Sequence, residues 1–158
     1  MQDPFAAPEI VKSAFLESRN CLAIYNIAPI LPGHSLVIPK EAYKSILELD
    51  DALMLEFFQL ARKATKVLLL AFGAEDFDWT IQDGANAGQT VPHLHLHIVP
   101  RRKGDLPHPG DWYPKLMQHE NAPVDSEERP RLSSADMRRT VSRLRELAGK
   151  SRTNGPGC

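Results

Sequence analysis

The run HLHLHIVP, from His93 to Pro100, constrains this chain more than any other stretch of its sequence. Histidines alternate with apolar residues, and a period of two is typical of a β-strand. In a strand, alternate side chains point to opposite faces, so His93, His95 and His97 would share one face. The apolar side chains between them would pack into a core. We therefore predict a strand over 91–99, ended by Pro100, with one face of histidines.

Other strands are predicted where short apolar runs are bounded by turn residues. They cover 21–26, 34–38 and 77–82, and the turn at 29–33 joins the first two into a hairpin. The glycine- and asparagine-rich stretch DGANAG, at 83–88, predicts a turn directly before the histidine run.

Two helices are predicted from apolar residues at helical spacing and from their end signals. The longer begins after Asp50 as N-cap, runs to about Phe72 and stops at Gly73. The shorter begins at the capping-box-like pair Ser133 and Asp136. The order of strands, helix, strands and helix predicts an α+β fold with an antiparallel sheet.

A length of 158 residues favours one domain with a sizeable core. We place that domain at 1–106 and a polar, proline-rich loop, expected to be mobile, at 107–131. A C-terminal helix over 132–149 is expected to pack on the same domain. The polar tail over 150–158 is expected to be disordered.

Composition excludes several classes of partner. A net charge of −1 provides no basic field for nucleic acid. The most apolar run, 67–72, is too short to span a membrane, and the first residues lack the pattern of a signal peptide. The two cysteines, Cys21 and Cys158, form no disulfide framework. We expect a cytoplasmic protein, with the nucleus as a second compartment.

Two chemistries suit a face of three histidines. Neutral imidazole is a common zinc ligand, and two histidines at i and i+2 can share a metal. The outer pair, however, would lie roughly 13 Å apart along the strand, with no carboxylate or thiolate nearby. Imidazole is also a good nucleophile toward phosphorus, and the middle residue, His95, is the best placed to attack. Its neighbours could stabilise charge on phosphoryl oxygens.

The segment before the histidines favours the second chemistry. GANAGQT, at 84–90, offers small residues whose backbone N–H groups could approach a phosphate. Alone it would indicate only a hairpin turn, but its position beside the histidines points to a phosphate-containing substrate.

The same segments resemble a known family. HLHLHIVP matches the histidine-triad motif, and QDGANAGQTVP, RRKGD and NIAPILPGHSLVIPK resemble the fragile-histidine-triad (Fhit) branch. After the triad the chain has Pro100 and Arg101, as that branch does, where the phosphoramidase branch typically has a glycine pair. The resemblance covers roughly 21–105 well.

The resemblance implies a five-stranded antiparallel sheet with one long central helix and a C-terminal helix, in a homodimer with a joined sheet. It implies hydrolysis of dinucleoside polyphosphates, with diadenosine triphosphate giving AMP and ADP through a covalent nucleotidyl-histidine. No tightly bound cofactor is expected, and the triad is expected to hold no metal. A divalent cation, Mg²⁺ or Mn²⁺, would accompany the substrate phosphates.

The resemblance also assigns catalytic roles. His95 matches the nucleophile, and His97 matches the imidazole that contacts the α-phosphate. His93 and His34 match two supporting histidines, and Gln82 matches a glutamine near the bridging oxygen of the leaving group.

Substrate-binding positions follow in the same way. Asn26 matches a ribose-binding asparagine. Candidates for the base pocket are Phe5, Ile10 and Ile24, with core packing as the competing interpretation. One departure is Pro92, which stands where the animal branch often has a basic residue and which removes one backbone N–H. The positions that match the phosphate-contacting segment are Gly88, Gln89, Thr90 and Val91.

Three alternatives stay open at this stage. A nucleoside phosphoramidase would use nearly the same site on a different substrate. A nucleotide-binding signalling protein would turn its ligand over only incidentally. A zinc enzyme would use the histidines as ligands.

Overall fold

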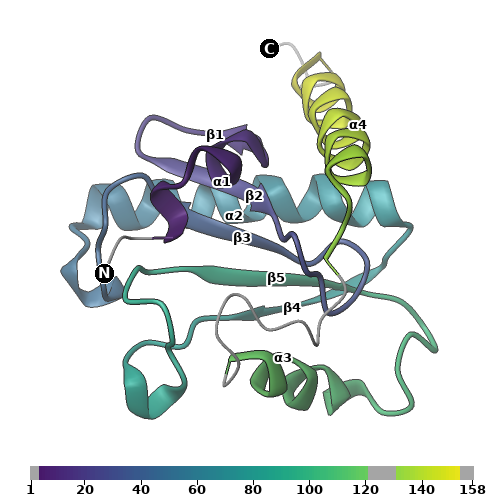
Figure 1. Cartoon of the computed structure of the whole chain (residues 1–158). Coiled ribbons are helices and arrows are strands. Elements are labelled where there is room, and N and C mark those ends of the chain that lie inside the picture. Colours follow the sequence, from purple (N-terminus) through teal and green to yellow (C-terminus); the bar gives the residue numbers. More distant parts are fainter. Residues whose placement is uncertain (1–3, 121–130, 154–158) are drawn as a thin grey trace.

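The computed structural model describes residues 4–120 and 131–153, and its centre is a five-stranded antiparallel sheet crossed by one long helix (Figure 1). The strands lie in the order β1-β2-β3-β5-β4. This arrangement confirms the predicted α+β fold. The strands are β1 (Ala14–Glu17), β2 (Cys21–Tyr25), β3 (Ser35–Pro39), β4 (Asp76–Thr80) and β5 (Leu96–Arg101).

In the part of the chain that the structure describes, four α-helices and four short 3₁₀ helices accompany the sheet. The α-helices are α1 (Pro8–Lys12), α2 (Asp51–Phe72), α3 (Trp112–Glu120) and α4 (Ser134–Thr153). The 3₁₀ helices are η1 (Pro4–Ala6), η2 (Ile46–Glu48), η3 (Ala85–Ala87) and η4 (Pro109–Asp111). Within the described ranges, no helix is both long and apolar enough to cross a membrane.

Helix α2 has the ends that the sequence predicts. The Asp50 side chain accepts a hydrogen bond from the Leu53 N–H, which satisfies one of the unpaired donors at the helix start. Gly73 takes the left-handed conformation at the other end, with φ of 59°. In α4, the Ser133 hydroxyl likewise accepts from the Asp136 N–H, as the capping pattern predicts.

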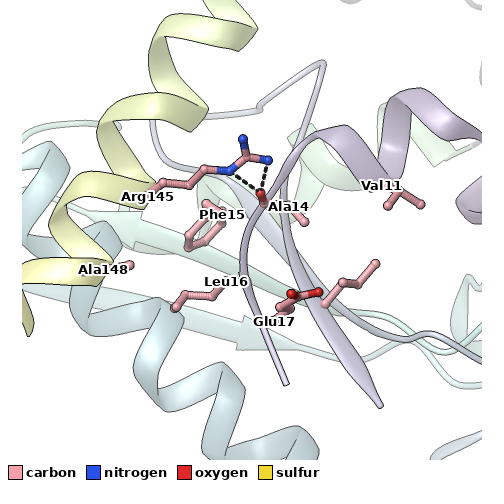
Figure 2. A pocket seen from close by; sticks show the side chains of 9 residues that line it. Val11, Ala14, Phe15, Leu16, Glu17, Arg145 and Ala148 are labelled. Carbon is pink, nitrogen blue, oxygen red and sulfur yellow. Dashed lines mark hydrogen bonds between the residues drawn. The ribbon is translucent and has the colours of Figure 1, made fainter. Parts of the chain in front are cut away.

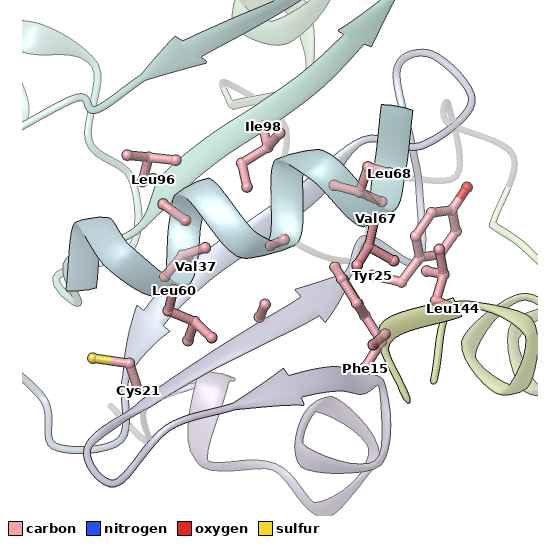
Figure 3. Close-up of a cluster of buried hydrophobic side chains, with 14 of the residues drawn as sticks. Phe15, Cys21, Tyr25, Val37, Leu60, Val67, Leu68, Leu96, Ile98 and Leu144 are labelled. Atoms are coloured by element: carbon pink, nitrogen blue, oxygen red, sulfur yellow. The ribbon is translucent and has the colours of Figure 1, made fainter. Parts of the chain in front are cut away.

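The two faces of the sheet bury different clusters. On one face, side chains of α2 and α4 pack against the sheet in the main core (Figure 3), which includes Leu94, Leu96 and Ile98 from the histidine run. The second, smaller cluster consists of Leu22, Ile24, Leu36 and Ile38, with Phe5, Ile10 and Ala14 packed against it. We call this cluster the apolar face of the site, because Leu36 pairs directly with His97 across β3 and β5.

The histidine strand differs from its predicted extent at both ends. It begins at Leu96 rather than at residue 91, so that only His97 of the triad lies in β5. It also continues through Pro100 to Arg101. Because β3 pairs only with Leu96–Ile98, β5 has a partner on one side at Pro100, where a strand tolerates a missing N–H.

Two predicted boundaries also change. The stretch assigned to a loop over 107–131 contains η4 and α3, and the α3 residue Leu116 is buried. Helix α4 runs to Thr153, four residues into the predicted tail. The expected mobility of the loop stays a prediction, and residues 121–130 and 154–158 lie outside the described residues.

Gly33, at the turn before β3, has no room for a side chain. Its φ is +93°, and an added Cβ would lie 2.7 Å from Pro100 Cγ and 3.0 Å from Phe72 Cδ2. The substitution Gly33→Ala should therefore cost about 2–4 kcal/mol, because it adds both backbone strain and overpacking. Urea unfolding of the purified variant measures this loss.

Gly104→Ala is the matched control, since Gly104 has φ of +77° with nothing within 4 Å of an added Cβ. It should cost only the backbone strain, about 1–2 kcal/mol. Equal losses in the two variants would contradict the crowding at Gly33.

Candidate active site

Four histidines meet on the face of the sheet opposite α2. His97 lies in β5, and His34 directly precedes the adjacent strand β3. The His97 ring centroid is 5.2 Å from that of His34 and 4.9 Å from that of His95. All four side chains, including His93, are buried, with at most 6% of their surface exposed. The structure therefore brings together the four histidines that the sequence singles out.

His93 and Leu94, which precede the β5 ladder, are held by the end of β3 and by the chain that follows it. His93 Nε2 lies 2.9 Å from the Pro39 carbonyl oxygen, so Nε2 carries the proton and donates. The Leu94 N–H donates to the Tyr43 carbonyl at 2.6 Å. These two bonds fix the extended backbone on either side of Leu94, and the alternation of side chains continues without a strand partner.

The hydrogen bond of His95 decides which ring nitrogen is nucleophilic. His95 Nδ1 lies 2.8 Å from the His93 carbonyl oxygen, which can only accept. The proton is therefore assigned to Nδ1, and Nε2 keeps its lone pair. The sequence identified no acceptor for this role, because the acceptor is a main-chain oxygen rather than a side chain.

The pKa of His95 supports the same neutral form. Burial lowers the pKa of His95 below its usual value of 6.5, since a charged ring would lose its hydration. The hydrogen bond to the His93 carbonyl opposes this shift, and the neighbouring His93 ring adds to it. The imidazole is thus neutral near pH 7, as an attacking nitrogen must be.

A second chain of hydrogen bonds orients His97. The Ile30 N–H donates to His34 Nδ1 at 3.2 Å, so the proton of His34 is on Nε2. His34 Nε2 then donates to His97 Nδ1 at 2.9 Å, which leaves the proton of His97 on Nε2. His97 is therefore a hydrogen-bond donor at Nε2, which suits it to bind a phosphoryl oxygen.

Gln82 and Asn26 follow β4 and β2, which lie on either side of the β3–β5 pair. Gln82 is buried, two residues beyond Thr80, which pairs with His97. Asn26 follows β2, and its backbone N–H donates to the His34 carbonyl at 3.1 Å. The Asn26 Oδ1 accepts from the Ala28 N–H at 2.9 Å, which fixes the side chain in a local turn.

The Gln89 side chain holds the proposed phosphate segment in place by two hydrogen bonds. Gln89 Oε1 accepts from the Gly84 N–H at 2.8 Å, and Gln89 Nε2 donates to the Lys44 carbonyl at 2.9 Å. Sequence reasoning missed Asp83, whose Oδ2 accepts from both the Ser45 hydroxyl and the Ile46 N–H. The Asp-Gly pair indicates a turn in the sequence, but nothing there shows its partner 37 residues away.

Two predicted base-pocket residues lie on the apolar side of the site. The Phe5 ring is 5.2 Å from the His93 ring and 5.5 Å from the His95 ring, between centroids. Ile24 is only 2% exposed within the apolar face of the site. Of the phosphate segment, Gly88, Gln89 and Val91 are half-buried and Thr90 is exposed.

A metal ion on the triad would compete with the hydrogen bonds of the histidine cluster. Among residues 4–120 and 131–153, no three His, Cys, Asp or Glu side chains are arranged as a metal site. Hydrogen bonds also occupy both ring nitrogens of His34 and at least one ring nitrogen of His93, His95 and His97. The arrangement fits a neutral nucleophile beside an oriented donor.

A family model described as the HIT domain matches residues 7–104. The chain belongs to the HIT domain family. A bis(5'-adenosyl)-triphosphatase of Dictyostelium discoideum is 31% identical over 149 residues, which cover 93% of this HIT protein and 94% of the relative. This likeness confirms the resemblance to the Fhit-type branch.

Two further comparisons add detail. An asymmetrical bis(5'-nucleosyl)-tetraphosphatase of Schizosaccharomyces pombe is 37% identical over 116 residues; these cover 73% of this HIT protein and 64% of that relative. A solved structure of a zinc-bound histidine-triad family protein from Mycobacterium smegmatis has a TM-score of 0.65 at 25% identity, and it covers 90% of this chain and 88% of that one.

Proposed function

We propose that this HIT protein is a dinucleoside polyphosphate hydrolase that cleaves diadenosine triphosphate to AMP and ADP. The observation that carries the proposal is the His95 ring, which is neutral, has Nδ1 tied to a carbonyl and keeps its lone pair on Nε2. The names of the relatives from Dictyostelium and fission yeast support a substrate of two nucleosides joined by phosphates.

The reaction proceeds in two in-line displacements. His95 Nε2 attacks the α-phosphorus, a P–N bond forms, and the bond from phosphorus to the bridging oxygen breaks to release ADP. Water then attacks the same phosphorus, the P–N bond breaks, AMP leaves, and one proton goes to solvent. A covalent nucleophile divides one difficult step into two easier ones.

Other residues of the site act on the same substrate. The His97 Nε2–H donates to a non-bridging oxygen, and backbone N–H groups of 88–91 contact the phosphates. Gln82 lies toward the leaving oxygen, Asn26 toward the ribose, and Phe5 and Ile24 toward the base. A divalent cation, Mg²⁺ or Mn²⁺, accompanies the phosphates rather than the triad.

Product analysis tests the proposal. The purified protein is incubated separately with diadenosine triphosphate, diadenosine tetraphosphate and an adenosine phosphoramidate, each with Mg²⁺. We expect equimolar AMP and ADP from the triphosphate and the highest kcat/KM on that substrate. A higher value on the phosphoramidate would assign the chain to that activity instead, and binding without turnover would make it a nucleotide-binding module.

A measurement of zinc content tests the remaining alternative, a zinc enzyme. Elemental analysis should find less than one zinc per chain, and activity should persist after zinc is removed and Mg²⁺ is restored. The M. smegmatis structure makes this comparison informative, since that protein is described as zinc-bound. Activity that is lost on zinc removal and returns only with zinc would contradict the nucleophile mechanism.

The pH profile of kcat/KM is expected to show its acidic limb below pH 6.5. Protonated His95 cannot attack phosphorus, and burial lowers the pKa of His95 from 6.5. His95 therefore becomes protonated, and the enzyme inactive, at a lower pH than an ordinary histidine would require. The pH dependence of kcat/KM reports this ionisation in the free enzyme. Activity assays from pH 4.5 to 8 give the midpoint, and an NMR titration of the His95 ring must coincide with it. A midpoint above 6.5 contradicts the prediction.

We propose a homodimer through the free edge of β4. Among the described residues, this edge strand pairs with another strand only on its β5 side, and it exposes Phe77 and Trp79 at 45% and 36% of their surfaces. Sedimentation at micromolar concentration should give about twice the chain mass of 17.7 kDa, and Phe77→Lys should shift it toward the monomer. A native protein that sediments as a monomer at these concentrations would refute the dimer.

A further inference from the structure

The residues before β1 cover one side of the histidine cluster. We call residues 4–13 the covering segment; it contains η1, α1 and Ser13 (Figure 1). Phe5, near its start, lies against the His93 and His95 rings, and Ile10 packs on the apolar face of the site. The position of this segment therefore shapes the space beside the nucleophile.

The covering segment cannot hold its own position. Its helix α1 has five residues, far fewer than a helix needs to be stable in isolation. A cavity of about 440 Å³ lies beside it, lined by Val11, Phe15 and Leu22 among others, so close packing is incomplete on that side. Hydrogen bonds at its junction with β1 must therefore supply much of its orientation.

Arg145, on α4, supplies three of those bonds, and Figure 2 shows its bonds to Ala14. Its Nε and Nη2 donate to the Ala14 carbonyl at 2.9 and 2.7 Å, and Nη2 also donates to the Lys12 carbonyl at 3.0 Å. Lys12 is the last residue of α1, where carbonyls lack partners within the helix and attract cations. The planar guanidinium reaches both carbonyls at once, which an ammonium group does less well.

The sheet holds the same junction from the other side. The Tyr25 N–H donates to the Ser13 carbonyl at 3.0 Å, and the buried Ser13 hydroxyl donates to the Ile10 carbonyl at 2.5 Å. The junction is thus clamped between β2 and Arg145. A substitution at Arg145 removes the hydrogen bonds on the α4 side of the junction and leaves every histidine unchanged.

We propose that Arg145 is a positioning residue for nucleoside recognition, which acts through the covering segment to hold Phe5 and Ile10 beside the bound base. The inference rests on the proposed function, because it takes the ligand to be a nucleotide. It differs from that function in placing part of the specificity on the C-terminal helix. The three hydrogen bonds of Arg145 go to the backbone of Lys12 and Ala14.

Titration calorimetry on the full chain tests the role with two probes, AMP and ribose 5-phosphate, which differ in the base. The variants are Arg145→Met, Arg145→Lys and the control Arg143→Met, an exposed arginine on the same helix. We expect Arg145→Met to raise the Kd for AMP about tenfold, the scale of losing charged hydrogen bonds, while ribose 5-phosphate binding stays unchanged. Arg145→Lys should show a smaller loss of the same kind, and Arg143→Met none.

Limited trypsin digestion provides a readout independent of ligand. Cleavage after Lys12 should become faster in Arg145→Met than in Arg143→Met at equal global stability. Equal cleavage in the two, equal weakening of both probes, or no AMP binding by the unmodified protein would each overturn the proposal. Selective loss of AMP binding in a protein that never cleaves diadenosine triphosphate would instead uphold Arg145 and refute the hydrolase.

Discussion

His95→Asn should abolish turnover of diadenosine triphosphate while AMP binding stays within a few-fold of the unmodified protein. Asparagine keeps a polar side chain in the site but cannot form the P–N bond. Loss of a general acid or base typically costs about 10²–10⁴-fold, and we expect a larger fall in kcat because the covalent route itself is closed. Binding still draws on the apolar face and on the phosphate segment, so kcat should fall far more than affinity.

Two measurements make this result decisive. Rapid quenching in base, with substrate labelled at the α-phosphate, should trap label on His95 through an acid-labile, base-stable bond. His108→Asn is the control, since His108 is an exposed histidine outside the cluster. Near-normal turnover by His95→Asn, or label that maps to another histidine, would show that His95 is not the nucleophile.

The second large effect on kcat is expected at His97, whose ring is oriented by the hydrogen bond from His34. His97→Leu removes the Nε2–H and should lower kcat by about 10²–10³-fold, the usual cost of losing one oxyanion donor. His34→Leu leaves the His97 ring present but deprives its Nδ1 of the 2.9 Å bond that fixes the tautomer. It should therefore cost less than His97→Leu.

A double-mutant cycle distinguishes this relay from two separate roles. If His34 acts only through His97, the variant with both changes should be no slower than His97→Leu alone. Thermal unfolding of all three variants shows whether each is folded at the assay temperature. Fully additive losses in kcat would mean that His34 acts on the substrate by a route of its own.

Sequence reasoning succeeded where the determinants are local. The ends of α2 follow from Asp50 and Gly73, each of which acts within one turn of its own position. Strands β2 and β3 were likewise predicted from short apolar runs around one turn. The histidine cluster was found because alternation along an extended chain needs no knowledge of strand partners.

The missed features depend on distant partners. Strand β1 was not predicted, because its four residues contain a register shift and lie in a segment with no clear alternation. The predicted start of β5 was wrong because the pairing with β3 stops at Val37 and Leu96, and the Leu94 N–H donates instead to the Tyr43 carbonyl. The proton positions within the cluster depend on bonds between residues far apart in the sequence, such as His34 and His97, which are separated by 63 residues.

The main-chain acceptor of His95 has a consequence for the second half of the reaction. A carboxylate in that position would make the imidazole more basic, and a more basic ring departs less readily from phosphorus. The His93 carbonyl carries no net charge, so it orients His95 without raising its basicity to that degree. The same atom that aims the ring for attack thus keeps it a competent leaving group when water arrives. No side-chain substitution at position 93 can delete that oxygen.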